Sequence, residues 1–138
     1  MPYQQQYRPK RALKSFRDLD VYQRSMECAV LTVKNFQQDL IKQKFPFTEN
    51  MVNCSMTIPL HIGESNSQRY SDFNLGVATL EKAMADCNKM IVYLEETRDI
   101  CDTGVPWDKF NELIKKYLFI RQKTLNLQRS WKKYMEGK

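Results

Sequence analysis

The strongest constraint on the fold is a heptad-like spacing of apolar residues that recurs in three long segments. The spacing alternates between three and four residues, which returns side chains to one face of an α-helix. The first segment carries it on Tyr22, Met26, Ala29, Val33, Phe36 and Leu40. The second carries it on Phe73, Val77, Leu80, Met84, Cys87, Ile91 and Leu94, and the third on Phe110, Leu113, Tyr117, Ile120, Thr124, Leu127, Trp131 and Tyr134. Three long amphipathic helices are therefore predicted.

A shorter helix is predicted between the first and second of these segments. Pro46 disfavours the helical conformation in the residue before it, so the first helix should end near residues 42–45. Thr48 suits the N-cap of the next helix, which we expect to kink at Pro59 and to end in a polar turn over residues 64–67. Its inward side chains are expected to be Met51, Cys54 or Ser55, Ile58 and Ile62.

The clearest break in the helical pattern separates the last two helices. Residues 102–106 read Asp-Thr-Gly-Val-Pro, where glycine can end one helix and proline can begin the next. We therefore expect the third helix over about residues 71–102 and the fourth after residue 106. Residues 1–15 lack apolar periodicity and are predicted to form a flexible basic arm.

These elements predict an all-α fold, an antiparallel up-and-down four-helix bundle over residues 16–138. Long stripes joined by short connections favour neighbouring helices that run in opposite directions. The stripes are also broader than a two-stranded seam, because further apolar residues lie beside them. These residues are Leu31, Ile41, Ile114, Leu118 and Leu125. A helix that is apolar on more than one side faces both its own core and another subunit, so we expect a homo-oligomer.

The basic residues of the chain, whose net charge is +6, gather at its two ends. Residues 1–17 hold five basic groups and no acid, residues 106–138 hold nine basic and three acidic groups, and the middle is acidic. This asymmetry favours either a polyanionic partner or subunits with complementary faces. The candidate phosphate-binding residues are Arg8, Lys10, Arg11, Lys14, Arg17, Lys115, Lys116, Arg121, Lys123, Arg129, Lys132 and Lys133.

Two interpretations of this basic surface remain open. Lysine and arginine along a helix can neutralise phosphates without reading sequence, which predicts a nucleic-acid partner. Alternatively, the same residues form a solvated helix face, or they meet an acidic protein or the acidic middle of a neighbouring subunit. The charge pattern is thus compatible with a nucleic-acid-binding protein and with a protein-interaction adaptor.

The sequence carries no motif of a catalytic, cofactor or metal site. Its four glycines are isolated, and its four cysteines form no Cys-x-x-Cys pair, so free thiols are expected. His61 is the only histidine, and no nucleophile pattern accompanies it. Glu95, Glu96 and Asp99 lie around Arg98 on one helix and are expected to form a solvated face. We therefore predict no enzymatic activity, no cofactor and no metal.

The sequence also contains no uncharged apolar run of membrane-spanning length and no secretory signal after Met1. We therefore expect a cytoplasmic protein without membrane contact.

Three stretches of the chain resemble known bundle proteins. Residues 16–23, Phe-Arg-Asp-Leu-Asp-Val-Tyr-Gln, resemble the opening of the proteins encoded in 23S rRNA intervening sequences, which have Phe, a basic residue, Asp-Leu and then Val-Trp-Gln. Residues 57–65, Thr-Ile-Pro-Leu-His-Ile-Gly-Glu-Ser, are similar to that family's Ser-Ile-Pro-x-Asn-Ile-Ala-Glu-Gly. Residues 128–131, Gln-Arg-Ser-Trp, resemble the Gly-x-x-x-Gly-x-Trp ending of the accessory variability determinants of diversity-generating retroelements.

This resemblance extends over about residues 16–134, with departures in the second motif. There, His61 replaces Asn, Gly63 replaces Ala and Ser65 replaces Gly. The resemblance implies a four-helix bundle that assembles into a homopentameric ring without catalysis. The retroelement branch implies binding to a reverse transcriptase and to nucleic acid through a basic surface, whereas the ribosomal branch implies a connection with rRNA.

Overall fold

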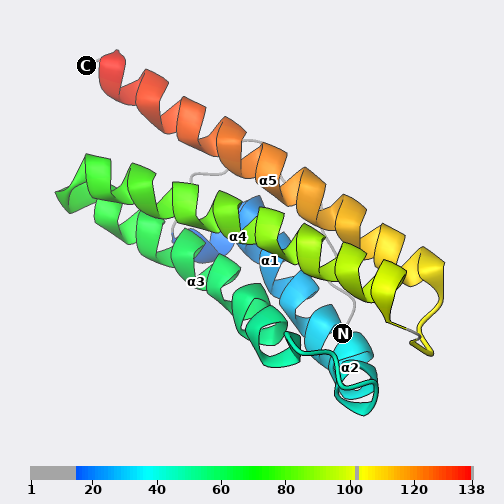
Figure 1. Cartoon of the computed structure of the whole chain (residues 1–138). Coiled ribbons are helices and arrows are strands. Elements are labelled where there is room, and N and C mark those ends of the chain that lie inside the picture. Colours follow the sequence, from blue (N-terminus) through cyan, green and yellow to red (C-terminus); the bar gives the residue numbers. More distant parts are fainter. Residues whose placement is uncertain (1–14, 102, 138) are drawn as a thin grey trace.

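Four long helical rods make up most of the computed structural model, which describes residues 15–101 and 103–137. The first rod consists of α1 (Asp20–Leu31), the π-helical turn η2 (Thr32–Phe36) and α2 (Gln37–Lys42), and the short 3-10 turn η1 (Phe16–Asp18) precedes it. The other rods are α3 (Thr48–Ser71), α4 (Phe73–Ile100) and α5 (Trp107–Glu136) (Figure 1). The described residues contain no strand, so the predicted all-α class with four helices is confirmed.

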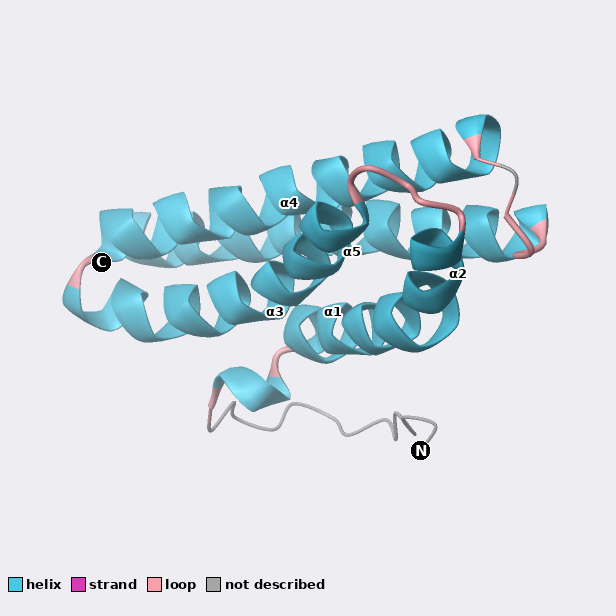
Figure 2. Ribbon diagram, turned by 60° about the horizontal axis from the view of Figure 1, so that its bottom comes forward, coloured by secondary structure: helices cyan, strands magenta, loops and turns pink. Residues whose placement is uncertain are grey.

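Each rod packs against two others around a shared hydrophobic core. Helix α1 contacts α3 and α5, and α4 contacts the same two helices. Figure 2 shows the short loops that join the rods. Large side chains that are fully buried between them are Leu40, Met51, Ile58, Ile62, Leu80, Met90, Leu94, Phe110, Tyr117 and Ile120. All four rods therefore depend on one core, as expected for helices that each bury one face.

The apolar stripe predicted on the first rod is wrong by one residue over its N-terminal half. The side chains buried there are Val21, Ser25, Cys28, Ala29 and Thr32. Only Ala29 among these was predicted, and Met26 is 41% exposed. The cause is the turn η2, in which the amide of Gln37 donates to the carbonyl of Thr32, five residues earlier. A π turn takes in one residue more than an α turn, so a heptad counted back from Phe36 slips by one.

Two of the residues that face the core on this rod are polar. The Ser25 hydroxyl donates to the Tyr22 carbonyl at 3.0 Å, and the Thr32 hydroxyl donates to the Cys28 carbonyl at 2.8 Å. Both hydroxyls are therefore satisfied within the helix, which removes most of the cost of burying them.

Helix α3 is longer than predicted. The polar turn expected over residues 64–67 is helical instead, and the helix ends only at Ser71. Ser65 is buried and its hydroxyl donates to the Ile62 carbonyl at 2.7 Å, so this side chain does not interrupt the helix. The true break is Asp72, whose carboxylate accepts from the amide of Leu75 at 3.2 Å and caps α4.

The N-cap predicted for α3 is also wrong. Thr48 is the first residue of the helix, the cap position is Phe47, and the Thr48 hydroxyl donates to the Phe45 carbonyl at 2.8 Å. Pro59 lies inside α3 as predicted. The predicted inward side chains are confirmed, since all of them are buried. These are Met51, Cys54, Ser55, Ile58 and Ile62.

The stripe predicted on α5 is confirmed except near its C-terminal end. Leu127 is half-buried and Tyr134 is 63% exposed, whereas Gln128 is buried. The Gln128 amide donates to the Val77 carbonyl at 3.4 Å and to the Glu81 carboxylate at 3.3 Å, which explains why a polar side chain faces α4 there. On α4, the predicted stripe residues are either buried or half-buried.

Helices α3 and α4 lie close together at Gly76, near the turn that joins them. A Cβ atom on Gly76 would lie 2.8 Å from the Cβ of Arg69 and 2.9 Å from its Cα and amide nitrogen. Real Cβ atoms do not come this close to backbone, so any side chain would push the two helices apart. Gly63, inside α3, has more room, since its Cβ would meet the Phe16 ring at 3.4 Å.

We therefore predict that Gly76→Ala destabilises the protein by about 1–3 kcal/mol, the usual effect of overpacking. Gly63→Ala is the matched control and should be neutral or stabilising by up to about 1 kcal/mol, because alanine favours helix over glycine. Urea unfolding followed by circular dichroism measures both. Equal stability of the two variants would contradict the close approach.

Candidate nucleic-acid interface

Helix α5 carries the larger part of the predicted basic surface. Between Glu112 and Glu136 it has seven basic residues and no acid. These seven are the predicted residues Lys115, Lys116, Arg121, Lys123, Arg129, Lys132 and Lys133. Lys116 is half-buried and the other six are exposed. All seven therefore lie on one helix, and six of the side chains are open to solvent.

The seven side chains do not form a single row. At 100° per residue, Lys115, Arg129 and Lys133 project away from the core. Lys116 and Lys123 lie on the flank that faces α1, while Arg121 and Lys132 lie on the flank that faces α4. The basic surface thus wraps around the exposed half of α5, and positive charge is present on three sides of the helix.

Most of these charges have no acidic partner in the part of the chain that the structure describes. Lys116 lies 3.4 Å from Glu27 of α1, and Lys123 lies over the Phe119 ring at 5.4 Å from its centre. Within the described residues, no carboxylate is within ion-pair distance of the other five, which are Lys115, Arg121, Arg129, Lys132 and Lys133. Unneutralised cations on a helix surface attract phosphates and gain entropy by releasing their counterions.

Of the predicted arm residues, only Arg17 belongs to the described part of the chain, and it does not lie on α5. Arg17 lies in η1, which packs against α1 and α3, so it is on another side of the bundle. The Arg17 carbonyl accepts from the Gln23 amide at 2.8 Å. The other arm residues, Arg8, Lys10, Arg11 and Lys14, lie outside the described residues.

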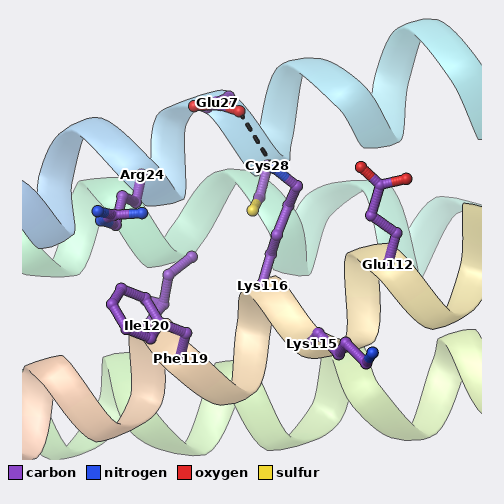
Figure 3. A pocket seen from close by; sticks show the side chains of 8 residues that line it. All are labelled: Arg24, Glu27, Cys28, Glu112, Lys115, Lys116, Phe119 and Ile120. Carbon is purple, nitrogen blue, oxygen red and sulfur yellow. Dashed lines mark hydrogen bonds and ion pairs between the residues drawn. The ribbon is translucent and has the colours of Figure 1, made fainter. Parts of the chain in front are cut away.

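A cleft of about 380 Å³ lies between α1 and α5, next to the basic surface (Figure 3). Its lining residues are Arg24, Glu27, Cys28, Glu112, Lys115, Lys116, Phe119 and Ile120. The Arg24 guanidinium is bound to the Asp20 carboxylate at 2.7 Å and covers the Phe119 ring. With Glu27 and Glu112 also present, the charges in the cleft are close to balanced. A polyanion is therefore better accommodated by the open side of α5 than by this cleft.

A polar cluster between α3 and α4 was not anticipated from the sequence. One oxygen of the buried Asp86 carboxylate accepts from the Thr57 hydroxyl at 2.9 Å and lies 3.0 Å from His61 Nδ1. The other oxygen lies 3.9 Å from Lys89 Nζ. In a nucleophile–histidine–aspartate relay the histidine lies between the hydroxyl and the carboxylate. Here the hydroxyl and the histidine both bind the same carboxylate oxygen, so the arrangement links two helices and lacks the relay order.

Two further properties of residues 15–101 and 103–137 concern metal ions and membranes. No group of three or more histidine, cysteine, aspartate or glutamate side chains is arranged to hold a metal ion. Nor does any of the described helices combine the length and the apolar character needed to cross a bilayer.

Comparison with family models, curated proteins and solved structures gives no match to this chain.

Three of the four cysteines are enclosed by the bundle. Cys28, Cys54 and Cys87 are buried, whereas Cys101 at the end of α4 is only partly covered. Burial raises the pKa of the Cys28 and Cys54 thiols to about 12, and it raises the pKa of Cys87 as well. A raised thiol pKa disfavours the thiolate, which is the reactive form.

We predict that a thiol reagent at pH 8 modifies Cys101 first and the three buried thiols only after unfolding. The rate of reaction with an aromatic disulfide reagent, followed by the absorbance of the released thiolate with and without urea, measures the accessibility of each class of thiol. Cys101→Ser should remove the fast reaction. Rapid labelling of Cys28 or Cys87 in the folded protein would show that the core opens more readily than the packing implies.

Proposed function

We propose that this protein is a non-enzymatic accessory protein that binds nucleic acid through α5. The observation that carries the proposal is the run of seven basic residues on α5 without an intervening acid, five of which have no carboxylate within ion-pair distance among the described residues. Contacts of this kind hold phosphates and do not depend on base sequence. The arm residues Arg8, Lys10, Arg11 and Lys14, together with Arg17, belong to the same proposal as additional phosphate contacts.

The arrangement of the rods is also part of the proposal. We propose that neighbouring rods run in opposite directions, because residue numbers rise along one helix as they fall along its neighbour. Contacting pairs are Gln68–Thr79, Thr57–Asp86 and Phe47–Tyr93 between α3 and α4, Arg98–Asn111 and Val77–Gln128 between α4 and α5, and Arg24–Phe119 and Glu27–Lys116 between α1 and α5.

An apolar groove on the surface favours self-association. It also supports the alternative function, which is binding of a protein partner. The groove has a volume of about 420 Å³ and runs between α1 and α3. Its lining includes Met26, Met56 and Leu60, whose side chains are 41–58% exposed. Adjacent exposed apolar side chains of this kind mark a contact surface. We propose that a second copy of the chain covers this groove.

The resemblance to intervening-sequence proteins and retroelement accessory proteins extends this proposal. It supports a pentameric ring as the oligomer, a cytoplasmic location, and a reverse transcriptase or rRNA as the functional context. A ring would repeat the α5 surface around its symmetry axis, and linked copies of a weak site bind one polymer far more tightly than a single copy does.

The nucleic-acid proposal predicts that Lys132→Glu with Lys133→Glu weakens binding to a structured RNA. The slope of log affinity against log salt should fall by about 1 for each lost phosphate contact. Fluorescence anisotropy over a salt series measures both quantities. Lys34→Glu with Lys42→Glu on the first rod is the matched control and should bind as the unaltered protein does.

Two results would contradict this assignment. The first is an absence of RNA binding by the unaltered protein at low salt. The second is a loss of the oligomer in the Lys132 and Lys133 variant, which would favour the adaptor function over the nucleic-acid function.

The groove predicts that Leu60→Asp dissociates the oligomer, because a carboxylate would be buried in an apolar contact. Light scattering should then give the monomer mass of 16.5 kDa in place of a multiple of it. Val92→Asp is the control, since Val92 is a similarly exposed apolar residue on α4. An unaltered protein that is monomeric at every concentration would contradict self-association.

A further inference from the structure

An arginine at the end of α3 is held against two aromatic rings. The Arg69 guanidinium lies 4.5 Å from the centre of the Trp131 ring and 4.6 Å from that of the Tyr70 ring. Its Nη2 also donates to the Tyr70 hydroxyl at 2.8 Å. Trp131 is buried in the core, whereas Tyr70 is 75% exposed. The core thus anchors the arginine, and the arginine in turn fixes a ring that is open to solvent.

The chain segments next to Arg69 and Trp131 hold more basic than acidic residues. Residues 127–135 of α5 contain Arg129, Lys132 and Lys133 and no acid. Residues 65–80 contain a single acid, Asp72, whose carboxylate is engaged in capping α4. Because Trp131 contacts Arg69, the basic residues within one turn of Trp131 lie at the same end of the bundle as Tyr70. The exposed ring and these cations thus belong to one end of the bundle.

A second arginine–aromatic contact provides an internal comparison. Near the connection between α4 and α5, Arg98 lies 5.6 Å from the centre of the Trp107 ring, and Trp107 is 62% exposed. Here, however, Arg98 is bound to Asp99 at 2.8 Å and lies 4.0 Å from Glu95. Residues 93–112 hold six acids and two basic residues. The same ring chemistry therefore occurs in surroundings that repel phosphate.

We propose that Tyr70, held by Arg69, is a stacking platform for an unpaired base of single-stranded nucleic acid. This inference rests on the proposed function and specifies its substrate class. Every base has a π face, so an aromatic ring beside a basic groove binds single strands with little sequence preference. Bases in a duplex are already stacked on each other and do not reach the ring. Lys132, on the flank of α5 that faces α4, would bind a phosphate of the same strand.

The test compares Tyr70→Ala with Trp107→Ala in fluorescence anisotropy. The probes are short uridine and thymidine homopolymers and a DNA duplex of equal length. Base–aromatic stacking contributes about 1–3 kcal/mol, so Tyr70→Ala should weaken binding to both single strands by about 5- to 150-fold. Its duplex affinity and the salt slope of duplex binding should be unchanged. Trp107→Ala should bind all probes as the unaltered protein does.

A conservative variant and a folding check complete the experiment. Tyr70→Phe keeps the ring and should retain most of the single-strand affinity, and the urea midpoint of each variant reports whether it folds. Single-strand binding that is unaffected by Tyr70→Ala, or equally weakened by Trp107→Ala, would overturn the platform alone. If the unaltered protein bound neither the single strands nor the duplex at low salt, the proposed function would fail and the platform with it.

Discussion

The inner face of α5 is buried along most of the helix, and this burial determines where its charged residues lie. Phe110, Tyr117 and Ile120 are fully buried on that face, and Trp131 is nearly so. Charged side chains are rarely buried without a partner, because the cost of removing them from water is high. Once the apolar row of α5 is fixed against α1 and α4, its seven basic residues occupy the remaining surface. The core packing and the positive surface are therefore two consequences of one sequence pattern.

The same burial also positions Tyr70, the exposed ring proposed to stack on a base. Trp131 closes the core near the C-terminal end of α5 and also positions Arg69 from α3. The close approach of α3 and α4 at Gly76 brings the backbone of Arg69 within reach of α4. An exposed Tyr70 ring and the basic turn of α5 are thereby held by buried contacts. Such preorganisation lowers the cost of ordering side chains on binding.

Sequence patterns predicted the features that depend on local chemistry. The α5 row from Phe110 to Trp131 repeats over several turns, and proline marks the helix boundaries near residues 46 and 106, so these were correct. The basic residues of α5 were also identified, since exposed charge is visible in any helical pattern. The π turn η2 was missed because spacing rules assume a constant number of residues per turn. Ser65 was wrongly predicted to lie in a turn, because a serine hydroxyl can also donate to a carbonyl of its own helix, as it does to Ile62.

Most of the features that could not be predicted are contacts between residues that lie far apart in the sequence. Asp86 meets Thr57 and His61 across 29 and 25 residues, and the pattern of α4 alone gives no sign of these partners. Lys116 is partly neutralised by Glu27, which is 89 residues away. The pairing of Arg69 with Trp131 likewise depends on the register between helices. Such contacts decide which basic residues remain available.

Lysine footprinting would locate the proposed contact between nucleic acid and the open side of α5. Lysine acetylation with and without bound RNA, read by mass spectrometry, reports which side chains become protected. We expect protection of Lys115, Lys132 and Lys133 and unchanged reactivity of Lys34 and Lys82, which are exposed on the first rod and on α4. Protection confined to Lys34 and Lys82, or spread equally over all of these lysines, would contradict it.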